Sequence, residues 1–169
     1  MESINTKFLT HSALLLALGV LFPFFFHQYG IAGRIFLPMH IPVLIAGFLV
    51  GPASGGLVGA LSPILSSLLT GMPTLPLTIL MVPELLTYGI LAGLLYQKLK
   101  VNLWLSLLGA MGGGRIIWTM MAVLISPILG IRARTLPVAL AALAASWPGM
   151  IIQLIFIPSL VERVKVSRR

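Results

Sequence analysis

The stretch TILMVPELLTYGIL, residues 78–91, decides the fold, because Glu84 is the single charged side chain in a run suited to hydrocarbon. The whole chain of 169 residues has the same character, with 59% hydrophobic and 8% charged residues. A soluble domain has roughly 25% charged residues. We therefore expect an all-α membrane protein whose residues 1–169 form a single domain.

The apolar segments of the chain are separated by glycine, proline and charged residues, and a membrane-spanning helix needs about 20 apolar residues. Six transmembrane helices are predicted, at 8–26, 35–50, 55–70, 76–97, 103–127 and 137–161. The second and third segments are short and are joined by GPASGG. We interpret them as helices that are tilted, broken or only partly spanning.

Lysine and arginine are unevenly divided between the two ends of these segments, and cytoplasmic loops retain the excess of positive charge. One face receives Lys7, Lys98, Lys100, Arg163, Lys165, Arg168 and Arg169, and the other receives Arg34, Arg132 and Arg134. This division predicts cytoplasmic N and C termini. It also accounts for the net charge of +8 without a nucleic-acid partner, so none is expected.

Several kinds of chemistry are excluded by residues that the sequence lacks. It has no aspartate and no cysteine, which excludes aspartate-rich metal sites, aspartyl dyads, disulfides and thiolate nucleophiles. His27 and His40 have no carboxylate nearby in sequence, so we expect no metal and no haem or other cofactor. Ser62, Ser66 and Ser67 have no deep histidine on a neighbouring segment, so we do not expect an enzyme.

Two side chains of opposite charge, Glu84 and Arg115, lie within predicted spans. At a rise of about 1.5 Å per residue they lie roughly 12 Å and 18 Å from the outer ends of their helices, so they can meet. An ionisable side chain at that depth costs several kcal/mol unless it has a partner or water. The same counting and helical spacing bring four more candidate substrate-binding residues to this layer: Tyr88, Trp118, Thr119 and Trp147.

Two interpretations of this layer stay open. Glu84 and Arg115 could form a neutralised pair that fixes the register of their helices. Alternatively, the layer is a substrate pocket, in which aromatic rings stack a planar ligand while charges and hydroxyl groups orient it. His40, near the predicted outer mouth, could bind that ligand or only cap a helix start. We interpret Gln153, deeper toward the cytoplasm, as satisfying a backbone group or a neighbouring helix.

Small residues recur at four-residue spacing along several predicted helices. The glycine sets are Gly51, Gly55 and Gly59; Gly89 and Gly93; and Gly109 and Gly113. Small residues at this spacing let helix backbones approach closely in a membrane, where no hydrophobic force drives association. We expect most of them to pack helices within this bundle.

The run LPMHIPVLIAGFLVGPASGGLVGALSPILSSLLTGMP, residues 37–73, followed by PELLTYGILAGLLY, residues 83–96, resembles the substrate-binding (S) components of energy-coupling factor (ECF) transporters. These are bacterial vitamin importers of the ABC superfamily. The resemblance implies a multi-pass protein of the bacterial cell membrane that binds a small water-soluble vitamin or precursor near the outer side. It also implies docking on a transmembrane coupling (T) subunit driven by two ATPase subunits.

In that family an Ala-x-x-x-Ala face on the first helix meets the T subunit, and the matching residues here are Ala13 and Ala17. The chain has no phosphate-binding loop of its own, which agrees with an energy source in another subunit. Aromatic residues with one cation and one anion favour a flat heterocycle as substrate. The alternatives are a self-sufficient channel or facilitator for small solutes and, less well supported, an intramembrane enzyme.

Overall fold

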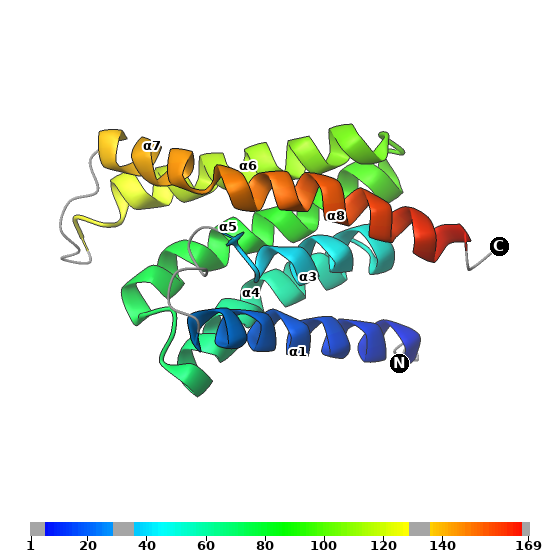
Figure 1. Ribbon diagram of the computed structural model, residues 1–169, viewed down its shortest axis with the longest axis horizontal. Coiled ribbons are helices and arrows are strands. Elements are labelled where there is room, and N and C mark those ends of the chain that lie inside the picture. The colour runs from blue at the N-terminus through cyan, green and yellow to red at the C-terminus, as the bar shows by residue number, and fades with distance from the viewer. Residues whose placement is uncertain (1–5, 29–35, 129–135, 167–169) are drawn as a thin grey trace.

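The computed structural model describes residues 6–28, 36–128 and 136–166, and over these ranges the chain is a bundle of helices without strands (Figure 1). The all-α prediction is confirmed. The elements in chain order are α1 (Thr6–Gln28), α3 (His40–Ile45), the π-helical η1 (Ala46–Val50), α4 (Pro52–Thr70), α5 (Leu75–Gly93), the π-helical η2 (Leu94–Lys98), α6 (Leu103–Leu124), α7 (Leu136–Ala145) and α8 (Trp147–Val166).

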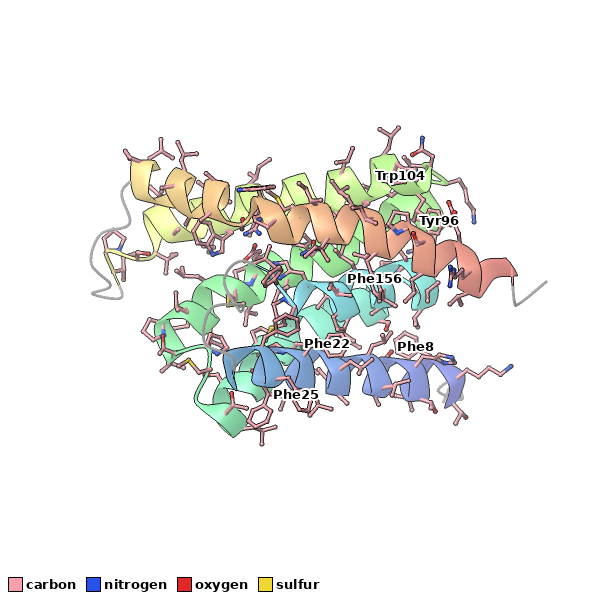
Figure 2. All side chains as sticks on the ribbon, in the orientation of Figure 1. Phe8, Phe22, Phe25, Tyr96, Trp104 and Phe156 are labelled. Atoms are coloured by element: carbon pink, nitrogen blue, oxygen red, sulfur yellow. The ribbon has the colours of Figure 1, made fainter. Side chains whose placement is uncertain are left out.

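Five of the described helices are long and apolar enough to cross a membrane: Thr6–Phe26, Pro52–Thr70, Leu75–Lys98, Leu103–Leu124 and Trp147–Val164. Their outward surfaces are apolar, as a helix surface facing lipid should be. Figure 2 shows Phe25 and Trp104 on the outside of the bundle, and both side chains, like that of Phe156, are exposed. The bundle therefore fits the predicted membrane environment.

The second predicted span, 35–50, is only a short apolar helix, His40–Val50, within the described residues. At about 1.5 Å per residue it covers roughly half of the hydrocarbon core. The helix begins late because Leu37 has a positive φ of 50° and the amide of His40 donates to the Leu37 carbonyl, which makes a turn before the first helical residue. His40 therefore starts α3 inside the bundle, and the described residues contain no sixth full-length span.

The last predicted span, 137–161, is two helices, α7 and α8, that meet at Ser146. Pro148 has no N–H to donate to the carbonyl of Ala144, so it cannot continue α7, whereas in the first turn of α8 no such bond is needed. Ser146 ends α7 through its amide and its hydroxyl, which both donate to the Leu143 carbonyl, at 3.1 Å and 2.8 Å. Only α8 is long enough to span.

Glycines form the contact between α4 and α5. A Cβ atom on Gly89 would overlap the Gly55 carbonyl, one on Gly59 would overlap the Leu85 carbonyl, and one on Gly93 would overlap the backbone of Pro52. Each near-neighbour is backbone, so neither helix has a side chain that could move aside. The expected packing role of these glycines is confirmed, and it fixes where α5 places its polar residues.

The N-terminal end of α1 and the C-terminal end of α8 lie at the same end of the molecule (Figure 1). The turn between η2 and α6 lies there as well, so Lys7, Lys98, Lys100 and Arg163 gather at one end. This arrangement agrees with the charge-based orientation, and the cytoplasmic location of the termini remains a prediction. Five of the basic residues that entered it lie outside the described residues: Arg34, Arg132, Arg134, Arg168 and Arg169.

Candidate functional site

Glu84 and Arg115 form a buried ion pair between α5 and α6. Nη1 of Arg115 donates a hydrogen bond of 3.0 Å to Oε1 of Glu84. The Glu84 side chain is 2% exposed and that of Arg115 is 14% exposed. The prediction that these two charges meet is confirmed.

The glycine run before Arg115 explains why the two helices come close enough for this pair. The ring of Tyr88 lies against Gly114, and the side chain of Leu91 lies against Gly113. A Cβ atom at either glycine would overlap these α5 side chains. The backbone of α6 can therefore approach α5 one residue before Arg115, and the guanidinium reaches the Glu84 carboxylate.

His40 joins the pair from the start of α3. Its Nε2 lies 3.4 Å from the same Glu84 oxygen that Arg115 contacts. Its ring meets the Tyr88 ring edge-on, with centroids 4.8 Å apart and planes at 86°. Both side chains are buried. His40 therefore belongs to the cluster inside the bundle, which we call the polar cluster: His40, Glu84, Tyr88 and Arg115.

The polar cluster contains more hydrogen-bonding capacity than it uses. Among the described residues no hydrogen-bond partner is found for Nδ1 of His40, the hydroxyl of Tyr88, or Nε and Nη2 of Arg115. All four atoms are buried, and an unsatisfied buried polar atom costs about 1–3 kcal/mol. Buried polar groups in native proteins are nearly always paired, so four such atoms in one cluster make it the candidate site for a bound molecule.

Gln153 is a further buried polar side chain that sequence reasoning assigned to packing. It lies on α8, which packs against α3 and α6, and neither its amide oxygen nor its amide nitrogen has a hydrogen-bond partner among the described residues. The expectation that it satisfies a backbone group or another helix is not met. The sequence did indicate that Gln153 is unusual, because an amide in the middle of an apolar helix costs free energy unless it forms hydrogen bonds.

Three other predicted site residues occupy different surroundings. Thr119 donates its hydroxyl to the carbonyl of Arg115 at 2.9 Å. Trp118 is 8% exposed and packs in a small apolar cluster with Ala122, Val123, Ala142 and Leu143. Trp147 is 58% exposed, so the expectation that it joins the buried layer is not met. The chain breaks at Ser146, so Trp147 is the first residue of α8 rather than an interior residue of one continuous helix.

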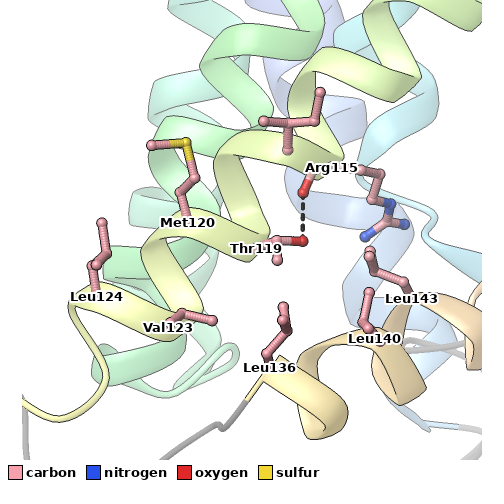
Figure 3. Close-up of a pocket in the computed structure, with 9 residues that line it drawn as sticks. Arg115, Thr119, Met120, Val123, Leu124, Leu136, Leu140 and Leu143 are labelled. Carbon is pink, nitrogen blue, oxygen red and sulfur yellow. Dashed lines mark hydrogen bonds between the residues drawn. The ribbon is translucent and has the colours of Figure 1, made fainter.

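A groove of about 510 Å³ runs between α6 and α7, beside the polar cluster (Figure 3). Arg115 and Thr119 supply its polar lining, and the rest is apolar: Ile116, Met120, Val123, Leu124, Leu136, Leu140 and Leu143. Arg115 thus faces the Glu84 carboxylate and also lines the groove. Within the described residues no group of three or more His, Cys, Asp or Glu side chains is placed to hold a metal ion.

The two predicted docking residues lie on the outer surface of the bundle. Ala13 and Ala17 are one turn apart on α1, and both are exposed. They form a flat strip because alanine projects only a methyl group. A partner helix can approach closely along such a strip.

Comparison with known protein families gives one match that covers most of the chain. The sequence model described as ECF transporter, substrate-specific component, matches residues 7–162. This range contains the whole polar cluster, the groove and both alanines on α1. No curated protein and no solved structure matches the chain.

Proposed function

The chain belongs to the family of ECF transporter substrate-specific components, and from this premise we propose that it binds a small water-soluble vitamin or vitamin precursor and carries it across the bacterial cell membrane. Membership makes the protein a substrate-specific component of a membrane transporter rather than an enzyme. The transport step requires a transmembrane coupling subunit and two ATPase subunits, which supply ATP hydrolysis.

The observation that carries the proposal is the unused hydrogen-bonding capacity of the polar cluster. A buried ion pair that only fixes helix register gains most when its remaining donors and acceptors are satisfied within the protein. Here four atoms have no such partner among the described residues: the Tyr88 hydroxyl, Nδ1 of His40, and Nε and Nη2 of Arg115. A polar solute that entered this cluster would satisfy these atoms. Its hydrogen bonds would be stronger there than in water, because the dielectric constant inside the bundle is low.

We propose a substrate with a flat ring system and polar substituents. The rings of His40 and Tyr88 offer apolar faces, while Glu84 and Arg115 offer one acceptor and one donor group of full charge. Gln153 adds an amide that can both donate and accept. A flat heterocycle would use both kinds of contact.

The test is the substitution Tyr88→Phe in the full chain. Native mass spectrometry of the purified protein would first identify the small molecule it retains, and titration calorimetry would then measure its affinity. We expect Tyr88→Phe to weaken binding by about tenfold, the loss of one buried hydrogen bond, because the ring still packs on Gly114.

The control is Tyr96→Phe, in η2 about two turns after Tyr88, which should leave affinity unchanged. Equal affinity of the Tyr88→Phe variant and the unaltered protein would remove the polar cluster from the binding site. Uptake of the solute into lipid vesicles then distinguishes a self-sufficient facilitator from a component that needs partner subunits. Uptake should require the coupling subunit, both ATPases and ATP, whereas equal uptake by this chain alone would show a facilitator.

We also propose that the exposed strip of Ala13 and Ala17 docks on the coupling subunit. The double substitution Ala13→Leu with Ala17→Leu should abolish co-purification with that subunit, because two leucines would hold the partner helix away. Ligand affinity should stay unchanged, since both alanines are exposed and lie on α1.

A matched control is available on α7, where Ala141 and Ala145 are also one turn apart and exposed. Their double substitution by leucine should leave co-purification intact. Survival of the complex after the α1 change would show that docking uses another surface.

A further inference from the structure

The guanidinium of Arg115 is only half used. Glu84 takes a single nitrogen, Nη1. The other two nitrogens, Nε and Nη2, are buried and have no partner among the described residues. In a guanidinium these two nitrogens lie along one edge and direct two parallel N–H bonds outward, a fork that matches the two oxygens of a carboxylate.

The unused edge belongs to a side chain that lines the groove between α6 and α7. Figure 3 shows the guanidinium head beside Leu140 and Leu143 of α7, on the far side from Thr119. The hydroxyl of Thr119 is already donated to the Arg115 carbonyl. Arg115 is therefore the one charged side chain among the nine that line the groove, and its free edge is buried rather than exposed to the groove.

The rest of the groove favours an apolar molecular body. Seven of its nine lining residues are Leu, Ile, Val or Met. Its volume of about 510 Å³ falls within the range of sites for small molecules. A ligand that matches both the Arg115 guanidinium and the apolar lining has one planar anionic group and a compact, weakly polar body.

We propose that the substrate carries a carboxylate, which pairs with the Nε–H and Nη2–H of Arg115, while its body lies in the groove between α6 and α7. Glu84 then acts as a positioning residue: it holds Nη1 and leaves the Nε–Nη2 edge free for the substrate. This inference rests on the proposed function and adds the chemical class of the substrate. The carbonyl oxygen of a neutral ring amide could also accept from this edge of Arg115. Comparing the affinities of acids with those of their neutral analogues distinguishes a carboxylate substrate from an amide substrate.

The test measures affinity of the detergent-purified full chain for three pairs: nicotinate and nicotinamide, biotin and biotinamide, pantothenate and panthenol. In at least one pair the acid should bind about tenfold or more tightly than its neutral analogue, because charge-assisted bidentate hydrogen bonds are about twice as strong as neutral ones. Arg115→Lys should remove this preference, since lysine keeps the positive charge beside Glu84 but has no planar fork. Arg163→Lys, exposed near the end of α8, is the matched control and should keep the preference.

Three results would overturn the inference: equal binding of acid and neutral analogues, a preference that survives Arg115→Lys, or no binding of any acid. The proposed function would survive each of them if a retained neutral solute binds and loses affinity in the Tyr88→Phe variant. Failure of every solute to bind would remove both proposals together. The acid preference of the unaltered protein is informative even if the Arg115→Lys variant does not fold.

Discussion

Replacing Glu84 alone by leucine should destabilise the protein by about 3–5 kcal/mol, because the substitution leaves the Arg115 guanidinium buried without its carboxylate. Replacing Arg115 alone by leucine should cost a similar amount, since the buried Glu84 would keep only the longer contact to His40. The measurement is denaturant or thermal unfolding of the purified protein without added ligand. Glu162→Leu, an exposed glutamate near the end of α8, is the control and should change stability little.

The double substitution Glu84→Leu with Arg115→Leu distinguishes a structural pair from a binding site. With both charges absent, no unpaired buried charge remains, and stability should return close to that of the unaltered protein. Ligand affinity should nevertheless fall by about a hundredfold or more, because the solute would lose two charged partners. Recovered stability together with unchanged affinity would show that the pair serves only to fix helix register.

The core of the site could be predicted from sequence because its cause is energetic and local. A carboxylate and a guanidinium in apolar helices each need a partner, and the chain offers them only each other at similar depth. Tyr88 follows because it lies one turn after Glu84 on the same helix face. These inferences use only the helical period, so they hold without knowledge of how the helices are arranged.

The residues that sequence reasoning misplaced depend on where the chain turns. Residues 35–50 are apolar enough for a full span, yet the helix starts only at His40, and that late start brings the imidazole to Glu84. Trp147 was expected in the same layer because residues 137–161 look continuous in composition. The break at Ser146 changes the direction in which α8 presents its first side chain. Composition records the apolar character of a segment but not its turns.

Gly89→Ala should lower stability by about 3 kcal/mol, even though alanine is the better helix former. The added methyl would overlap the Gly55 carbonyl on α4, and both partners are backbone, so α4 and α5 would have to separate. Glu84 lies little more than one turn before Gly89 on α5. The separation should therefore disturb the polar cluster and weaken ligand binding as well as the fold.

Gly112→Ala supplies the comparison, since a methyl group there meets nothing within 4 Å. This variant should be as stable as the unaltered protein or more stable by about 1 kcal/mol, because alanine raises helix propensity. Unfolding midpoints and ligand affinities of the two variants, measured side by side, decide the matter. If Gly89→Ala were as stable as Gly112→Ala, α4 and α5 would not be in backbone contact. The site would then depend on α5 and α6 alone, where Gly113 and Gly114 make the other close approach.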